Sequence, residues 1–419
     1  METEQTQLTV ANDATVEFLV RFARAAHNAG YPTADFEDRL VSLADALGLE
    51  AAQVSATPTL VELSFGTLTR QRTYALRVHP PSVDLDAIAR LEDLAQDIVS
   101  GRVTTETALG RLADITAHPL RRPWYVQLAA YAVAGGAVTP VLGGSWREVL
   151  TGGLVGLVVG AVALVARRRS RAEPMVAPLA AVAASFTAAA LVRTGLKASP
   201  DVVTLAALVT FLPGMALTIG VRELATGHLQ SGVANTANAL IQLLGLVFGV
   251  GVGRSIAAHW FGATQRTVHQ TGFTGTQLLA AVAAGLAFTV TLRAQSRAAP
   301  IMCAATLLAI STNAIGRSLV GAAAGTFIAA LAIGLVGGVV ASRLRRPPLV
   351  FIVPGVLMLV PGSAGFRSLL QLLTGQTVSG ISAGFNTFVT AMAIAYGLMV
   401  ATVVVPPRVT GDRGRDSPM

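Results

Sequence analysis

The spacing of apolar residues changes at about residue 120 of this 419-residue chain. Before that point, apolar and polar residues alternate with the periods of amphipathic helices and half-buried strands. From Trp124 onward they form successive runs near the ~20 residues that a helix needs to cross a bilayer. We place ten runs at 124–143, 147–166, 175–194, 201–219, 233–253, 275–292, 299–316, 320–341, 348–372 and 381–405. The pattern predicts an α-helical polytopic membrane protein with about ten transmembrane helices and a small N-terminal α+β domain.

The first 120 residues carry both helical and strand patterns. Helical spacing of apolar residues predicts helices over 14–29, 33–48, 83–99 and 104–116. The segments 54–66 and 69–78 are rich in β-branched and aromatic residues and flank a glycine-containing turn, which predicts an antiparallel hairpin. Pro58 cannot donate a backbone hydrogen bond to a sheet, so we expect it on an edge.

Charge divides the chain at the same place. Residues 1–120 carry 17 acidic residues and 9 arginines, a net charge of −8, whereas the remainder carries 6 acidic and 22 basic residues, a net charge of +16. The basic residues lie between apolar runs rather than on one basic face, which argues against nucleic-acid binding. With the N-terminal domain in the cytoplasm, fifteen basic residues fall on the cytoplasmic side and seven on the other. The positive-inside rule therefore predicts that both termini are cytoplasmic.

An internal repeat links the two halves of the apolar region. Residues 213–238 align without gaps on residues 361–386, at an offset of 148, and nine of the 26 columns are identical. The identities include Pro-Gly, Thr-Gly and Ser-Gly pairs and the asparagines Asn238 and Asn386. Because the offset spans five predicted helices, an odd number, the second copy has the opposite orientation in the membrane. The predicted domains are 1–120 (cytoplasmic), 124–260 and 272–405 (five-helix repeats) and 406–419 (disordered tail).

Inverted repeats with Pro- or Gly-interrupted helices are typical of secondary transporters, whose substrate sites lie near the bilayer midplane. Polar residues cluster beside the interruptions here, and on the fifth predicted helix Asn235, Asn238 and Gln242 share one helical face. An intramembrane Asn either joins helices by hydrogen bonds or lines a pathway, and we favour the pathway for the repeated pair. The predicted substrate-binding residues are Pro213, Gly214, Thr218, Asn235, Asn238, Gln242, Pro361, Gly362, Ser363, Asn386, Thr387 and Thr390.

Acidic residues are absent from Leu224 to Gly411, which excludes a carboxylate relay in the second half. The remaining candidates for proton coupling are Glu223, Asp201 and His228, with Glu148 and Glu173 less favoured. Glu223 is preferred because it lies inside the repeated motif. For the others a solvated charge at the membrane interface is the simpler interpretation.

No further chemistry is expected. The single cysteine, Cys303, lies in an apolar run, and the histidines lack metal-ligand spacing, so neither a metal site nor a cofactor is predicted. The N-terminal domain has no Gly-x-Ser-x-Gly motif, and an enzyme is not expected. The first ten residues have neither the basic nor the apolar region of a signal peptide, so we expect no cleaved leader.

The chain resembles the threonine/serine exporter family of bacterial inner-membrane proteins. The resemblance is carried in the N-terminal domain by GYPTADFEDRL (30–40), VSATPTLVELS (54–64) and the stretch 83–115. In the apolar region it is carried by FLPGMALTIGVRELATGHLQSGVA (211–234) and VPGVLMLVPGSAGFRSLLQLLTG (353–375). Together these segments span nearly the whole chain. Where the family often has Asp after the basic residue of the first Pro-Gly motif, this chain has Glu223.

The resemblance implies a cytoplasmic N-terminal domain, ten transmembrane helices, and export of L-threonine and L-serine driven by the proton-motive force. It does not fix the substrate, because relatives split into two subunits resemble dicarboxylate (succinate) exporters. The partners expected are a small-molecule substrate and the lipid bilayer, and a homo-oligomer is compatible with this arrangement. The alternatives are a hydrolase in the N-terminal domain and an uncoupled channel or scaffold.

Overall fold

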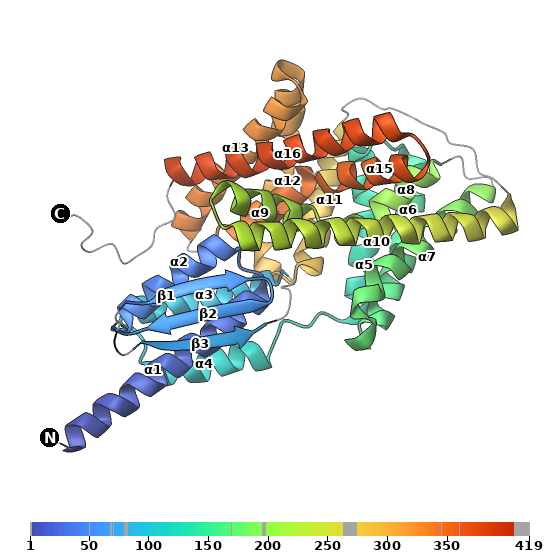
Figure 1. Cartoon of the computed structure of the whole chain (residues 1–419). Coiled ribbons are helices and arrows are strands. Elements are labelled where there is room, and N and C mark those ends of the chain that lie inside the picture. The colour runs from blue at the N-terminus through green and yellow to red at the C-terminus, as the bar shows by residue number, and fades with distance from the viewer. Residues whose placement is uncertain are drawn as a thin grey trace.

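The computed structural model describes residues 2–49, 51–67, 69, 71–78, 83–168, 170–194, 198–262, 275–344, 346–359 and 361–405. This part of the chain is mostly helical, with one small sheet near the N-terminus (Figure 1). The predicted disordered tail 406–419 lies outside the described residues. We call the part before Trp124 the head and the part from Trp124 onward the body.

The head packs four helices on a three-stranded antiparallel sheet of order β1-β2-β3. The helices are α1 (Glu2–Ala29), α2 (Thr33–Ala46), α3 (Leu85–Val99) and α4 (Thr105–Ala117), and the strands are β1 (Gln53–Thr57), β2 (Leu60–Phe65) and β3 (Arg72–Arg77). Phe18, Phe22, Leu63 and Ile88 are fully buried between them. The four predicted helices are confirmed, although α1 begins well before residue 14.

The predicted single strand over 54–66 is wrong, because the chain reverses direction after β1. Thr57 Oγ1 donates to the Leu60 carbonyl oxygen at 3.2 Å and accepts from the Leu60 N–H at 3.1 Å, which closes the turn. Pro58 lies in this turn rather than on an edge strand. A turn suits proline because it requires no ladder hydrogen bond from the missing N–H.

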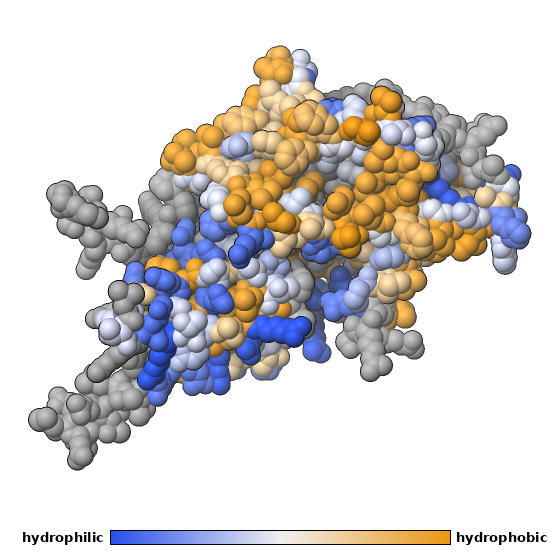
Figure 2. Space-filling model, in the orientation of Figure 1, coloured by the Kyte–Doolittle hydropathy of each residue, from blue (hydrophilic) through white to orange (hydrophobic). Residues whose placement is uncertain are grey.

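The body is a bundle of helices whose outer surface is largely apolar, whereas polar residues gather on the head (Figure 2). Its helices are α5 (Trp124–Val141), α6 (Trp146–Ala166), α7 (Val176–Arg193), α8 (Pro200–Ala207), α9 (Gly214–Ala225), α10 (Leu229–Phe261), α11 (Gly275–Thr291), α12 (Ala299–Val320), α13 (Ala322–Leu344), α14 (Leu349–Leu359), α15 (Pro361–Leu373) and α16 (Thr377–Val404). Short 3₁₀ turns, η1 (Ser170–Met175), η2 (Val209–Phe211) and η3 (Ser296–Ala298), precede α7, α9 and α12.

Among the described residues, seven spans are long and apolar enough to cross a membrane, or eight if the pair bent by 50° between α8 and α9 counts as one. The predicted count of ten is therefore not confirmed. The two predicted spans outside this set are α5 and α11. Helix α11 has only 17 residues, and α5 begins with the less apolar sequence Trp-Tyr-Val-Gln. These two helices pack against each other.

The same order of helix packing recurs in both halves of the body. In the first half α6 packs on α5 and α7, while α10 packs on α7 and α9. In the second half α12 packs on α11 and α13, while α16 packs on α13 and α15. Contacts between the halves are also reciprocal, because α9 packs on α16 and α10 packs on α15. Each half therefore places a short broken helix between its own long helix and that of the other half.

Candidate substrate site at the crossing of two broken helices

The two Pro-Gly motifs of the repeat meet inside the body. Helix α9 begins at Gly214 after the 3₁₀ turn η2, and Pro361 and Gly362 are the first described residues of α15, which forms one candidate span with α14 over Leu349–Leu373. A Cβ atom added to Gly362 would lie 3.1 Å from the Gly214 backbone nitrogen and 3.0 Å from Leu212 Cβ. The backbones of the two motifs are thus in direct contact, and the contact has no room for a side chain at Gly362.

The meeting point includes the N-terminal end of α9. Such ends present unpaired backbone N–H groups and the positive end of the helix dipole. Pro213, the residue before α9, supplies no side-chain hydrogen bond to these groups. The positive end of α9 favours a bound carboxylate or other anion at this place.

Beyond the crossing, each half-helix continues into a turn of the same geometry. Gly227 and Gly375 have φ angles of +88° and +78°, in the left-handed region that favours glycine. The preceding threonines act alike: Thr226 Oγ1 donates to the Arg222 carbonyl oxygen at 3.1 Å, and Thr374 Oγ1 donates to the Leu370 carbonyl oxygen at 3.0 Å. All of these pairs are 148 residues apart, the offset of the sequence repeat.

Close packing between half-helix and long helix also repeats. A Cβ atom on Gly232 would lie 2.8 Å from the Leu224 nitrogen, and one on Gly380 would lie 3.0 Å from the Leu372 nitrogen. Glycine is required at both positions because the backbones of the paired helices approach so closely. The two hairpins, α9–α10 and α15–α16, therefore share backbone structure as well as sequence.

Glu223 is the buried carboxylate of the first hairpin, with only 2% of its surface exposed. Its Oε2 accepts hydrogen bonds from Ser231 Oγ at 2.9 Å and from Asn235 Nδ2 at 2.7 Å. Its other oxygen, Oε1, is buried without a hydrogen-bond partner among the described residues. Nine residues separate Glu223 from Gly214 on α9, a distance of about 13.5 Å along the helix axis.

The head contacts this hairpin through the first turns of α2. Thr33 Oγ1 lies 2.9 Å from Ser231 Oγ, the hydroxyl that donates to Glu223, so a hydrogen-bond chain runs from the head to the carboxylate. Arg222 forms an ion pair with Asp35 at 2.9 Å. His228 Nε2 lies 3.4 Å from Glu37 Oε2. Burial raises the pKa of the Glu37 carboxyl, and its hydrogen bond from the Ala56 N–H and the nearby His228 oppose the rise.

Each of the other acidic candidates for proton coupling either has a partner within the protein or is exposed on the surface. Asp201 forms an ion pair with Arg254. Glu148 is buried as part of a capping box with Ser145 and accepts from the Ser199 N–H at 3.1 Å. Glu173 is exposed on η1. No group of three or more His, Cys, Asp or Glu side chains in the described part of the chain is placed to hold a metal.

The predicted substrate-binding residues occupy different environments. Thr218 and Thr387 are buried, and their hydroxyls donate to the carbonyl oxygens of Gly214 at 2.9 Å and Ala383 at 2.8 Å. Ser363 is buried one residue after Gly362, whereas Asn238 and Thr390 are half-buried. Gln242 and Asn386 are exposed on the body surface.

Asn238 and Asn386 lie on long helices that are joined through the broken helices. Helix α10 packs on α9 and α15, and α16 packs on α15 and α9. In the structure the two Pro-Gly motifs thus lie in contact with each other, and Glu223 and Asn235 form a hydrogen-bonded pair. The two repeated asparagines lie on separate long helices.

Sequence reasoning missed two residues: one that contacts Glu223 and one that occupies the equivalent position in the repeat. Ser231 donates to the carboxylate, and its signal was present because Ser231 and Ser379 are identical in the repeat. Gln371 occupies the position equivalent to Glu223, and its Oε1 is also buried without a partner among the described residues. Comparing non-identical columns would have found this acid-to-amide replacement.

Comparison with known families assigns the chain to a class of membrane exporters. The family model described as "Putative threonine/serine exporter" matches residues 17–257, and a second, described as "Threonine/Serine exporter, ThrE", matches residues 274–404. The chain therefore belongs to the threonine/serine exporter family.

Its relatives include bacterial and fungal proteins. The chain is 26% identical to a "Probable threonine/serine exporter" of Mycobacterium tuberculosis over 94% of this chain and 76% of that protein. It is 23% identical to the "Threonine/serine exporter" of Corynebacterium glutamicum over 91% of this chain and 81% of that protein. It is also 24% identical to "Pheromone-regulated membrane protein 10" of Eremothecium gossypii over 93% of this chain and 54% of that protein. No solved structure matches the chain.

Proposed function

We propose that this protein is a secondary active exporter of small polar amino acids, with L-threonine and L-serine as substrates, in a bacterial inner membrane. The observation that carries the proposal is the contact between the two Pro-Gly motifs, at which the half-helix α9 begins. Broken helices at a repeat interface are where secondary transporters bind their substrates. The family and its named bacterial relatives support the substrate class.

An amino acid matches the polarity of the crossing. Its carboxylate would be attracted by the N-terminal end of α9, and its ammonium group by backbone carbonyl oxygens near the break. The hydroxyls of Thr218 and Ser363, close to the two breaks, are within reach of a small polar side chain on this view. The polar faces of α10 and α16 would line the route to the site.

Alternating access would follow if the two halves form an inverted repeat. The reciprocal packing of α9 on α16 and of α10 on α15 supports an inverted repeat. Rocking one five-helix half against the other would expose the crossing first to the cytoplasm and then to the outside. The head contacts the turn between α9 and α10, which on this topology lies on the cytoplasmic side together with both termini.

Glu223 would couple transport to protons. It is buried, its Oε1 has no hydrogen-bond partner among the described residues, and the segment 224–411 contains no other carboxyl group. Asp201 and Glu148 already have partners that account for their positions. Because Glu223 lies about nine residues from the break, proton transfer and substrate binding would occupy neighbouring rather than identical sites.

Substrate exchange in proteoliposomes tests the function. Vesicles that contain the purified chain and unlabelled threonine should take up labelled threonine and serine, and control vesicles should not. Exchange of labelled succinate in place of both amino acids would assign the protein to dicarboxylate export. A current that persists without exchange, and that an uncoupler leaves unchanged, would indicate a channel and overturn the proposal.

A single substitution tests the proton pathway. In Glu223→Gln we expect threonine accumulation driven by an imposed pH gradient to fall at least tenfold, while exchange at zero gradient continues. Glu173→Gln, which alters an exposed carboxyl on η1, should leave both activities unchanged. If Glu223→Gln retains gradient-driven accumulation, this glutamate is not the coupling group.

A further inference from the structure

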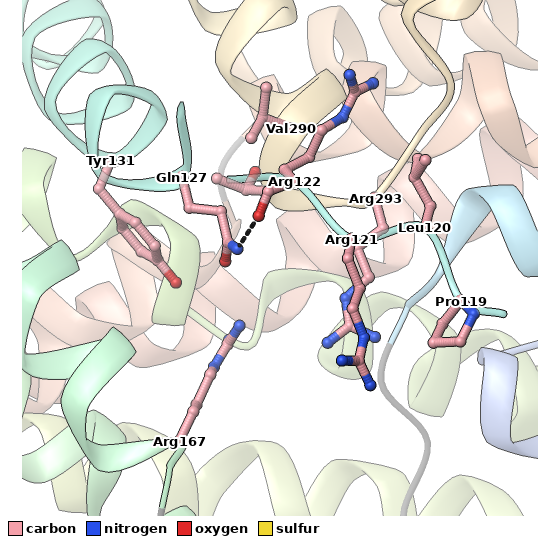
Figure 3. A pocket seen from close by; sticks show the side chains of 10 residues that line it. Pro119, Leu120, Arg121, Arg122, Gln127, Tyr131, Arg167, Val290 and Arg293 are labelled. Atoms are coloured by element: carbon pink, nitrogen blue, oxygen red, sulfur yellow. Dashed lines mark hydrogen bonds between the residues drawn. The ribbon is translucent and has the colours of Figure 1, made fainter. Parts of the chain in front are cut away.

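A cavity of about 320 Å³ lies where the head, α5, α6 and α11 meet, and four arginines line it (Figure 3). Arg121 and Arg122 come from the connection between α4 and α5, Arg167 from the end of α6, and Arg293 from the turn after α11. Segments from both halves of the body thus contribute positive charge to one place. This cavity is separate from the crossing and from Glu223, because neither Glu223 nor any residue of the two Pro-Gly motifs lines it.

The cavity has an excess of positive charge. Its other lining residues are Pro119, Leu120, Gln127, Tyr131, Val290 and Thr291, and none of them is acidic. Arg293 pairs with Asp84 of the head at 3.2 Å, whereas Arg121 and Arg167 form no ion pair with any residue of the described chain. In Figure 3 the guanidinium group of Arg167 points toward Gln127 and Tyr131. An anion in the cavity would offset charges that the protein itself leaves unbalanced.

Arg122 is held differently. Its Nη2 donates to the Ala294 carbonyl oxygen at 3.1 Å and to Ser296 Oγ at 3.0 Å. Its Nε is buried without a hydrogen-bond partner among the described residues. These hydrogen bonds fix the side chain and join the start of α5 to the turn between α11 and α12. This wall of the cavity is therefore held in place without a bound ligand.

The position of the cavity points to the membrane surface. Trp124 and Tyr125 begin α5 directly after Arg121 and Arg122, and they are 64% and 60% exposed. Trp and Tyr are enriched where a membrane protein crosses the interface between hydrocarbon and water. Basic pockets between transmembrane helices at this level bind phosphate headgroups of anionic lipids.

We propose that this arginine-lined cavity binds the phosphate headgroup of an anionic membrane lipid. Guanidinium groups suit phosphate because they donate paired hydrogen bonds to its oxygens. An amino-acid substrate suits the cavity poorly, since its ammonium group would enter among guanidinium groups with no carboxylate in the lining. The bound lipid would hold α5, α6 and α11 together beneath the head. It would also contact Arg293, which already forms an ion pair with Asp84 of the head.

Thermal unfolding of the purified full-length chain in detergent tests the lipid site. Added phosphatidylglycerol should raise the melting temperature in a saturable way, and phosphatidylcholine should not. The double substitution Arg121→Gln, Arg167→Gln should weaken the apparent affinity for phosphatidylglycerol at least tenfold. Arg168→Gln, which removes an adjacent exposed arginine outside the lining, should change it less than twofold.

Three results would overturn the proposal: an unchanged affinity in the double variant, an equal effect of phosphatidylcholine, or the same saturable stabilisation by inorganic phosphate alone. The last would identify a site for free phosphate rather than lipid. If the double variant does not fold, Arg167→Gln alone carries the test, since this exposed side chain at a helix end has no ion-pair partner in the described chain. Its expected loss of affinity is about threefold or more.

Discussion

The two hairpins of the body share their turn geometry and close glycine contacts, but they differ in charge. In α9–α10 the half-helix carries Arg222 and Glu223, whereas the equivalent positions in α15–α16 are Leu370 and Gln371. Both turns use a Thr hydroxyl and a left-handed glycine in the same way. The repeated sequence therefore specifies the scaffold, and the columns that differ specify where charge is placed.

The charged hairpin is also the one that the head contacts. Asp35 pairs with Arg222, and Thr33 reaches Ser231, which donates to Glu223. In the second hairpin the equivalent of Ser231 is Ser379, which is exposed and has a valine, Val378, beside it. Of the two hairpins, α9–α10 thus carries the buried carboxylate and the Asp35 and Thr33 contacts with the head, while α15–α16 keeps the same turn geometry without them.

The largest effect is expected where the two hairpins meet. Gly362→Ala adds a Cβ atom 3.0 to 3.1 Å from Leu212 and Gly214, and overpacking of this kind costs about 1–3 kcal/mol. We expect threonine exchange to fall at least tenfold. Gly251→Ala on α10, where an added Cβ meets nothing within 4 Å, should exchange normally. Normal exchange by Gly362→Ala would mean that the contact is dispensable.

Equivalent glycines test whether the halves are equivalent in packing. Gly232→Ala and Gly380→Ala each direct a Cβ atom at a backbone nitrogen, of Leu224 and Leu372 respectively. Both should lower the melting temperature of the detergent-solubilised protein by similar amounts, consistent with a cost of about 1–3 kcal/mol each. A large decrease for one and none for the other would show that the hairpins pack differently.

The repeated asparagines test the polar faces of the long helices. Asn238→Ala and Asn386→Ala should each reduce threonine flux about fivefold, the value of one hydrogen bond of about 1 kcal/mol, without reducing the yield of folded protein. Flux per folded molecule in proteoliposomes is the measurement. If both variants transport at the normal rate, these asparagines do not line the pathway.

The smallest effect is expected at the contact with the head. The Arg222–Asp35 pair is partly exposed, so its coupling free energy should be about 0–1 kcal/mol. A double-mutant cycle with Asp35→Asn and Arg222→Gln, scored by thermal unfolding at low salt, measures it. Asp45→Asn, an exposed acid of the same helix α2, should show no coupling to Arg222. If Asp45→Asn shows the same coupling to Arg222, the coupling is a long-range effect of charge and does not depend on the contact between Asp35 and Arg222.

Much of this architecture could be predicted from the sequence. The offset of 148 residues paired the two Pro-Gly motifs, which lie in contact, and Glu223 stood out because it lies inside the repeated motif. Apolar run length counted α5 and α11 as spans, although neither is among the described helices that are long and apolar enough to cross a membrane, and it did not show that the two pack on each other. Run length reports local hydropathy, whereas helix pairing is decided by packing between distant segments.

Other features depend on contacts that periodicity cannot show. The Thr33–Ser231 hydrogen bond joins residues 198 positions apart, so neither helix pattern predicts it. The turn at Pro58 had a local signal, because Thr-Pro-Thr is a turn sequence, but the β-branched residues around it favoured a continuous strand. The arginines of the lipid site were counted for topology alone, since only the fold brings Arg121, Arg167 and Arg293 to one cavity.

A threonine-bound structure of the full chain in a lipid nanodisc tests the central claim most directly. The account predicts density for the amino acid at the crossing, with its carboxylate at the first turn of α9 beside Gly214 and Gly362. Density that lies elsewhere, for example among the arginines of the lipid site, would contradict it.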